Sequence, residues 1–125
     1  MHAFINQEGA LVDVNTAISV NFTNGAVGNL SYTSMSPEWR EEFTFYGTEG
    51  MIRFGASEPL YVHRKGEDIR LPKTPGQGKP PADNFIEAIL GVAEVQAPPL
   101  CGLRVVQLTE AAYKSAETGK PELVG

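Results

Sequence analysis

The sequence has little of several features that would point to a specific function. A single cysteine excludes an intrachain disulfide and fits a reducing compartment. The net charge is -5, so a nucleic-acid surface, which needs clustered Lys and Arg, is not indicated. No apolar run approaches the about 18 residues of a membrane span, and no secretory segment is present. We therefore expect a cytoplasmic chain that binds neither nucleic acid nor membrane.

The sequence also lacks the groupings of residues that carry most enzyme chemistry. His2 and His63 lie far from each other and from Cys101 in the sequence, and none has the spacing of metal ligands. Glu41 and Glu42 are neighbours, so on a strand they face opposite sides and cannot act together as acid and base. Cys101 has no motif that pairs it with a base. No catalytic residue and no metal ligand is therefore predicted.

Glycine is present, but not in the pattern of a nucleotide-binding loop. The turn at Gly47-Thr48-Glu49-Gly50 lacks the G-x-G-x-x-G spacing and joins two antiparallel strands. In residues 76–79, Gly-Gln-Gly-Lys, the second glycine is misplaced and prolines follow. Residues 64–79 are locally basic, which suits an anionic group, although a solvated hairpin and loop explains them more simply. No cofactor-binding residue is predicted in this chain.

Length and apolar pattern define a single globular domain. The chain has 125 residues, of which 42% are hydrophobic and 20% charged. Residues 3–71 have strand-like patterns, residues 72–81 form a loop rich in Pro and Gly, and helical patterns follow. Thr23-Asn24-Gly25 predicts a hairpin turn, because Asn and Gly tolerate positive φ. The remaining predicted strands are residues 26–33, 40–46, 51–54, 60–63 and 69–71, which alternate with turns as in a meander.

Two helices are predicted after the loop. The first is capped by Asp83 and runs to about Leu90, with Phe85, Ile86, Ile89 and Leu90 on its apolar side. The second covers residues 103–120 and ends at Gly119 and Pro121. Its apolar face is formed by Leu103, Val106, Leu108, Ala112, Tyr113 and Ala116.

Strands followed by helices predict an α+β fold: an open, mainly antiparallel sheet with two helices on one face. The other face would then lack a cover, although large apolar groups point to both sides. Phe43 and Phe45 face opposite to Tyr46, for example. A partner surface is the simplest cover; the alternative is a mixed face exposed to solvent.

Several segments together carry a resemblance to a known family. They are Phe22–Leu30 (FTNGAVGNL), Trp39–Glu42 (WREE), Tyr46–Phe54 (YGTEGMIRF), Asn84–Ile89 (NFIEAI), Gly102–Val106 (GLRVV) and Ser115–Pro121 (SAETGKP). In this order they resemble the C-terminal half of the Gfo/Idh/MocA oxidoreductases, over nearly the whole chain. The resemblance implies an α/β domain on an open antiparallel sheet, which covers the substrate and forms a homo-oligomer through its exposed sheet face.

In that family an N-terminal Rossmann domain binds NAD or NADP. This sequence lacks the family's Gly-rich fingerprint, its Glu-Lys-Pro segment with the catalytic lysine, and its G-x-H-x-x-D-like motif. The resemblance therefore implies that residues 1–125 are a partial C-terminal substrate and oligomerisation domain, inert alone, and that Met1 need not be a natural start. Where relatives often have Asp before Gly-Leu-Arg, this chain has Cys101, which puts the N-cap of that helix in doubt.

Trp39 and Arg40 are the candidate substrate-proximal residues, because the corresponding loop in the family can approach the substrate pocket. Stacking would suit Trp39, and contact with an anion or hydroxyl would suit Arg40; packing at the sheet edge is the alternative. The expected function is that of the substrate-side domain of a nicotinamide-dependent oxidoreductase acting on a sugar, polyol or similar hydroxyl compound. The alternatives are a free-standing dimerisation or ligand-binding module and, weakest, an independent small enzyme.

Overall fold

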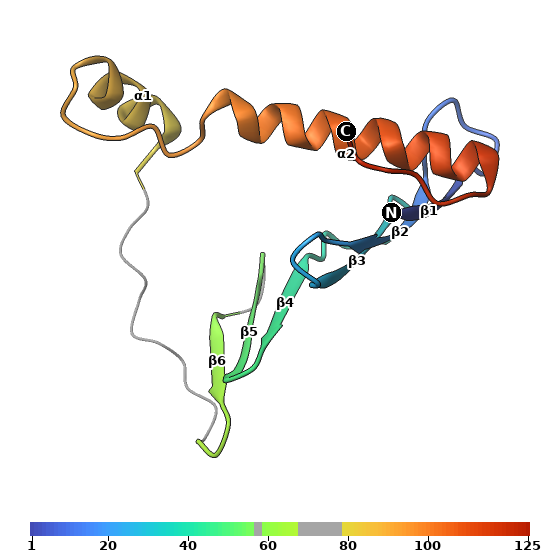
Figure 1. Ribbon diagram of the computed structural model, residues 1–125, viewed down its shortest axis with the longest axis horizontal. Coiled ribbons are helices and arrows are strands. Elements are labelled where there is room, and N and C mark those ends of the chain that lie inside the picture. Colours follow the sequence, from blue (N-terminus) through green and yellow to red (C-terminus); the bar gives the residue numbers. More distant parts are fainter. Residues whose placement is uncertain (57–58, 68–78) are drawn as a thin grey trace. The chain divides into compact units, whose positions relative to one another are not determined.

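The computed structural model describes residues 1–56, 59–67 and 79–125 (Figure 1). Strands precede helices, and the strand pairs of the described residues are antiparallel, so the predicted α+β class is confirmed. The elements in order are β1 (His2–Asn6), β2 (Asn15–Asn21), β3 (Val27–Thr33), β4 (Glu42–Gly47), β5 (Gly50–Gly55), β6 (Tyr61–Arg64), α1 (Pro81–Ile89) and α2 (Pro99–Thr118).

The chain divides into two compact units. Unit 1 comprises residues 1–35 and 87–125, and unit 2 comprises residues 36–86. Each unit contains a three-stranded sheet, in the order β1-β2-β3 or β4-β5-β6. The strands of the described residues thus form two short sheets and not one continuous ladder.

The hairpin of β2 and β3 follows the sequence prediction. The amide of Phe22 donates to the carbonyl of Ala26 at 2.9 Å, and the amide of Gly25 donates to the carbonyl of Phe22 at 2.9 Å. Gly25 alone takes positive φ in this turn, at 87°. The side-chain Oδ1 of Asn24 instead accepts a hydrogen bond from the amide of Ala26 at 3.0 Å. Asn and Gly therefore stabilise the same turn by different means.

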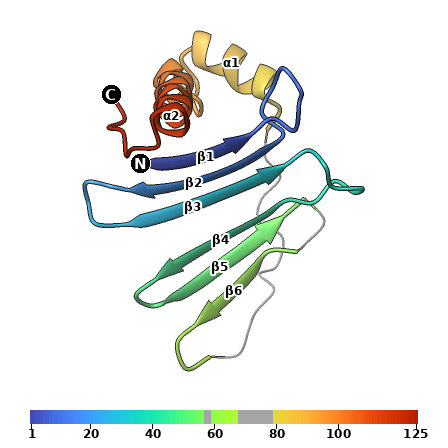
Figure 2. The same cartoon turned by 90° about the vertical axis from the view of Figure 1, so that its right-hand side faces the viewer.

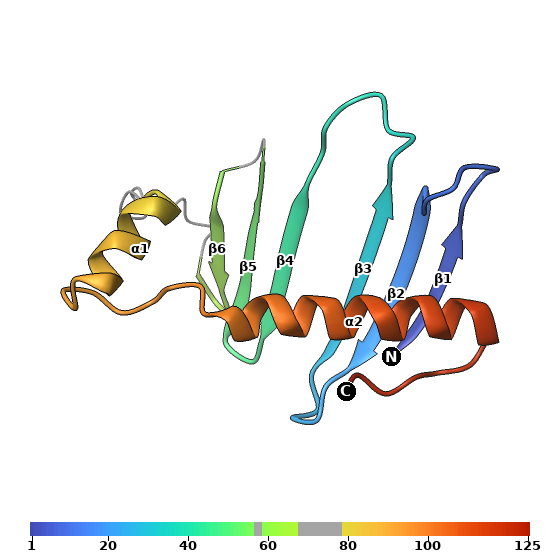
Figure 3. The same cartoon turned by 90° about the horizontal axis from the view of Figure 1, so that it is seen from above.

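Helix α2 packs against β1 in unit 1 and crosses it (Figures 2 and 3). It begins at Pro99, earlier than the predicted Leu103, and Pro98 precedes it without a side-chain capping bond. Proline suits the first helical turn because its missing N–H would have no partner there. Gly119 ends the helix as predicted, with φ of 65° and its amide bonded to the carbonyl of Ser115 at 2.9 Å.

Small side chains form the contact between α2 and the sheet. Ala3 is 1% exposed, Ala112 is 3% exposed, and Ser115 is completely buried. The predicted apolar face of this helix was only partly right, since Leu103 and Val106 are about half exposed, at 51% and 53%. Short side chains allow the helix backbone to approach β1 closely, and the contact lies in the C-terminal part of α2 (Figure 3).

In unit 2, the predicted strands at residues 40–46, 51–54 and 60–63 appear as β4, β5 and β6. Gly47 pairs with Gly50 around a turn of two residues, as the sequence indicates. A Cβ atom at Gly50 would overlap the carbonyl oxygen of His63, so the close approach of β6 requires glycine there. The predicted strand at residues 69–71 and residues 72–78 of the predicted loop lie outside the described residues.

Helix α1 begins at Pro81, and Asp83 lies in its first turn instead of capping it. The amide of Asp83 donates to the carbonyl of Pro80 at 3.0 Å, and its carboxylate is favourable near the positive end of the helix. The apolar side chains predicted for this helix are exposed: Phe85, Ile86 and Ile89 within α1, and Leu90 directly after it. Of the helices in the described ranges, none combines the length and apolar content that a membrane span requires.

Candidate substrate and assembly surfaces

Trp39 and Arg40 lie in the loop that leads into β4. The hydroxyl of Ser36 donates to the carbonyl of Glu38 at 2.6 Å, and this bond stabilises the loop directly before Trp39. Trp39 is 80% exposed, and Arg40 is exposed as well. An indole ring that is open to solvent is available for stacking, and a neighbouring guanidinium is available for an anion.

The residues considered for metal or acid–base chemistry are dispersed over the described parts of the chain. His2 lies on β1, His63 on β6, and the exposed Cys101 within the first turn of α2 instead of before it. Glu41 precedes β4, and its carbonyl accepts a hydrogen bond from Ala56 at 3.3 Å. Within residues 1–56, 59–67 and 79–125, no three His, Cys, Asp or Glu side chains are grouped to hold a metal ion.

The described residues do not fit a nicotinamide cofactor. Its pyrophosphate is normally bound by backbone N–H groups at a helix N-terminus that follows a parallel strand and a glycine-rich turn. Here the glycine pair Gly47 and Gly50 joins two antiparallel strands. Helix α2 is preceded by Pro98 and starts with Pro99, and neither residue has an N–H to donate.

One face of the unit 2 sheet is apolar, and we call it the phenylalanine face. Its side chains come from directly paired positions, which share a face of an antiparallel sheet. The ring of Phe54 lies 5.2 Å from that of Phe43 and 6.1 Å from that of Phe45. Phe45 is 60% exposed. The face comprises Phe43, Phe45, Ile52, Phe54 and Val62, and the prediction that Phe43 and Phe45 face opposite to Tyr46 agrees with this register.

The other face of the unit 2 sheet is mixed. The guanidinium of Arg53 lies 4.8 Å from the centre of the Tyr61 ring, a cation–π contact. Tyr46 is 82% exposed, and its neighbours in register are Met51 and His63.

The face of the unit 1 sheet that points away from Ala3 carries no Asp, Glu, Lys or Arg side chain, and we call it the uncharged face. Ser19 donates to the side-chain oxygen of Asn29 at 2.9 Å, and Thr33 donates to that of Asn15 at 2.6 Å. Phe4 is 66% exposed there. The face comprises His2, Phe4, Asn6, Asn15, Ala17, Ser19, Asn21, Val27, Asn29, Ser31 and Thr33.

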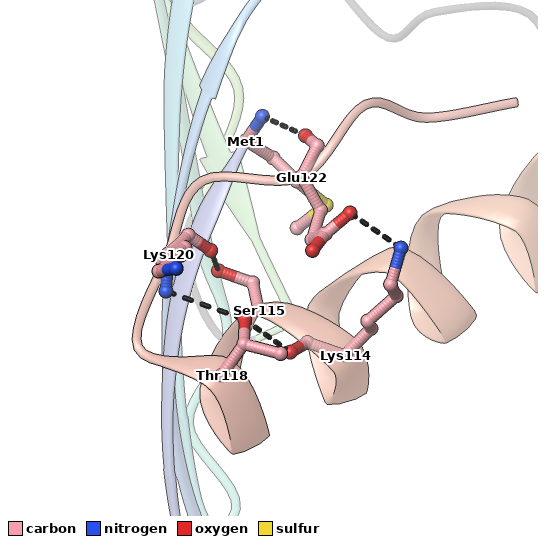
Figure 4. A network of polar contacts seen from close by, with 6 residues as sticks. All are labelled: Met1, Lys114, Ser115, Thr118, Lys120 and Glu122. Carbon is pink, nitrogen blue, oxygen red and sulfur yellow. Dashed lines mark hydrogen bonds and ion pairs between the residues drawn. The ribbon is translucent and has the colours of Figure 1, made fainter.

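Sequence reasoning missed the polar contacts that join the chain's ends to the helix (Figure 4). The amide of Ala3 donates to the Ser115 hydroxyl at 3.1 Å, and that hydroxyl donates to the carbonyl of Lys120 at 2.7 Å. Glu122 exchanges backbone hydrogen bonds with Met1, at 2.7 and 2.9 Å, and its carboxylate pairs with Lys114 at 2.8 Å. The Ser-Ala-Glu-Thr-Gly motif is the sequence signal that could have indicated these contacts. Its Ser115 makes the bonds to Ala3 and Lys120, and its Gly119 donates to the Ser115 carbonyl.

A second missed contact joins α2 to the loop after β1. The hydroxyl of Tyr113 donates to Asp13 Oδ1 at 2.7 Å. This bond is the largest cause that lowers the pKa of Asp13 and raises the pKa of Tyr113. The pair is exposed to solvent, so it fixes the position of the loop and contributes little to the core.

The antiparallel sheets and the helices that follow them define an α+β domain. The chain belongs to the C-terminal α/β domain of the Gfo/Idh/MocA oxidoreductase family, whose model matches residues 6–123. No curated protein matches the chain.

Three solved structures show the same fold at low identity. The WlbA dehydrogenase from Bordetella pertussis, in complex with NADH and UDP-GlcNAcA, is 20% identical, with a TM-score of 0.73 over 99% of this chain and 38% of its own. The WlbA dehydrogenase from Chromobacterium violaceum, in complex with the same two compounds, is 22% identical, with a TM-score of 0.71 over 95% and 38%. An NAD-binding protein from Listeria innocua is 19% identical, with a TM-score of 0.70 over 95% and 39%. The chain thus spans about two fifths of each of these proteins.

Proposed function

We propose that residues 1–125 are the substrate-side and oligomerisation domain of a nicotinamide-dependent oxidoreductase. The match of residues 6–123 to the C-terminal α/β domain of an oxidoreductase family carries this proposal. A separate Rossmann domain would bind NAD or NADP, and hydride transfer would take place between that domain and this one. The substrate would be a sugar, polyol or similar hydroxyl compound. Two similar structures contain NADH and UDP-GlcNAcA, which supports NAD and makes nucleotide-linked sugars the first compounds to test.

The genomic sequence upstream of Met1 tests the domain assignment. An in-frame Rossmann domain with a Glu-Lys-Pro segment would support it. A ribosome-binding site at Met1 without such a neighbour would favour a free-standing module instead. Calorimetry gives an independent check, because the chain by itself should not bind NAD(H) or NADP(H); micromolar affinity would contradict the proposal.

Within this function, Trp39 and Arg40 would contact the substrate. Trp39 is the single tryptophan of the chain, so its fluorescence reports on that loop alone. Titration with UDP-GlcNAcA should quench this fluorescence, and Arg40→Ala should weaken the effect by removing a charge that pairs with an anionic group. Arg104→Ala is the matched control, since the Arg104 guanidinium bonds to Gln107 at 2.9 Å within α2. An equal response of wild type and Arg40→Ala would remove Arg40 from the site.

The uncharged face of unit 1 would form the homo-oligomer. Interface cores are depleted of charged side chains, because a charge that loses water without a partner is costly. Phe4 and Val27, 66% and 72% exposed, would supply apolar area on this face. Ser31→Lys places a charge on this face, on β3 beside Ala17 of the middle strand, and should shift a dimer or higher oligomer to monomer in sedimentation velocity. Gln7→Lys adds the same charge in an exposed loop and should leave it unchanged; a monomeric wild type would refute this assignment.

A further inference from the structure

We propose that Asn24 is a deamidation site, at which the chain modifies itself without an enzyme. The residue after it, Gly25, has no side chain to shield the backbone nitrogen that attacks in this reaction. Both residues are exposed at the tip of the β2–β3 hairpin. Hairpin tips open more readily than strand interiors, since few buried contacts hold them.

The other asparagines are protected by their positions. Asn6, Asn15, Asn21 and Asn29 lie in strands, and Asn84 lies in α1. A backbone within a strand ladder or helix cannot easily take the ring-closing conformation. Each is also followed by a residue that carries a side chain: Gln7, Thr16, Phe22, Leu30 and Phe85.

The reaction balances without any co-reactant except water. The Gly25 nitrogen loses its proton to solvent base and attacks Asn24 Cγ. A Gly25 N–Cγ bond forms, the Cγ–Nδ2 bond breaks, and the amide nitrogen leaves as ammonia. Water then opens the cyclic imide at either carbonyl, which yields aspartate or isoaspartate. No oxidation or reduction takes place.

The hydrogen bonds of the turn act on this step in opposite directions. The amide of Ala26 donates to Asn24 Oδ1 at 3.0 Å, and a donor at this oxygen stabilises the negative charge that develops on it during attack. The N–H of Gly25 is held by the carbonyl of Phe22 at 2.9 Å, and this bond has to break first. Reaction therefore begins when the tip of the hairpin opens while Ala26 remains near the side chain.

Deamidation would change both charge and backbone at this tip. It adds one negative charge to a chain whose net charge is -5. Isoaspartate also inserts the Asn24 Cβ into the main chain, which lengthens the turn beside the paired residues Asn21 and Val27. The β2–β3 register near the turn is then the part of unit 1 that the modification disturbs.

The test is incubation of the folded full chain in ¹⁸O-labelled water at mildly alkaline pH, followed by peptide mass mapping. Loss of the Asn24 amide is expected before loss at any other asparagine, with a mixture of isoaspartate and aspartate that each carry the label. Asn29 is the internal control, because it lies in the same hairpin and accepts a hydrogen bond from Ser19. An intact Asn24 when Asn29 or another asparagine has reacted, or a product that is aspartate alone, would overturn the proposal.

Discussion

Units 1 and 2 both contain a three-stranded antiparallel sheet, yet they are stabilised differently. In unit 1, a helix lies on the sheet, and buried Ala3, Ala112 and Ser115 form the contact. In unit 2, the phenylalanine face is largely exposed, and close backbone approach at glycines determines strand pairing. We therefore expect the largest loss of stability in unit 1 when the buried Ser115 hydroxyl is removed. In unit 2 we expect it when a side chain is added at Gly50, where the strands approach closely.

Removal of the Ser115 hydroxyl should give the largest loss. Ser115→Ala leaves the buried Ala3 amide without this partner and also removes the partly buried bond to the Lys120 carbonyl, which should lower the free energy of unfolding by about 2–4 kcal/mol. Urea denaturation, followed by spectroscopic signals from unit 1, would measure this loss of stability. Thr109→Ala is the matched control, because the Thr109 hydroxyl also donates to a backbone carbonyl but is exposed. If both variants lost the same stability, the buried position of Ser115 would not be the cause.

Gly50→Ala should come next and should act on unit 2. The new Cβ would overlap the carbonyl oxygen of His63, so β6 has to move away from β5 at a cost of about 1–3 kcal/mol. Gly47→Ala is the control, since a Cβ there would meet its nearest neighbour at an ordinary 3.7 Å. Amide hydrogen exchange would show faster exchange in β5 and β6 for Gly50→Ala, with unit 1 unchanged. Equal exchange in the two variants would contradict this reading of the turn.

The contact of Arg53 with Tyr61 should give a smaller effect. A cation–π contact near the surface is worth about 0.5–1 kcal/mol, and that amount should appear as the coupling energy of a double-mutant cycle with Arg53→Met and Tyr61→Leu. Additive single and double variants, measured by chemical denaturation, would show that the two side chains are neighbours without interaction.

The smallest effect should come from the exposed pair of Asp13 and Tyr113. The lowered pKa of Asp13 means that its contribution is present above the ordinary value of 3.8 and is lost as the pH falls through the folded value. The raised pKa of Tyr113 means that the contribution is present below 10.0 and is lost as the pH rises through the folded value. Tyr113→Phe should therefore flatten the pH dependence of stability at both ends. Parallel curves for wild type and variant would refute the coupling.

Much of the local structure could be predicted because local signals determine it. Thr23-Asn24-Gly25 and Gly47-Thr48-Glu49-Gly50 gave the two hairpin turns, and Gly119 gave the end of α2. The N-termini of the helices were harder to predict. The sequence pattern places Asp83 and Cys101 at or before a helix N-terminus, whereas Pro81 and Pro99 begin these helices. Proline is favoured in the first turn of a helix, because the N–H that it lacks would have no partner there. The two prolines are therefore the better sequence signal for where these helices begin.

The candidate site was less predictable than the fold. Trp39 and Arg40 came from family resemblance, and their role in substrate binding stays a prediction. The contacts of Ser115 and Tyr113 with β1 and its loop depend on residues about a hundred positions apart, which no local pattern specifies.

The sequence by itself determined the α+β class, the hairpin turns and the family. These follow from the spacing of apolar residues, from the residue types in the turns and from the order of the motifs, all of which can be read from the sequence directly. The tertiary structure decided which side chains are buried. Along α2, Leu103 and Val106 of the predicted apolar face are exposed, whereas Ala112 of that face is buried together with Ala111 and Ser115, which the pattern did not include. The reason is geometric: a helix lies close to an edge strand only where its side chains are short, and the sequence pattern does not say which part of a helix meets that strand.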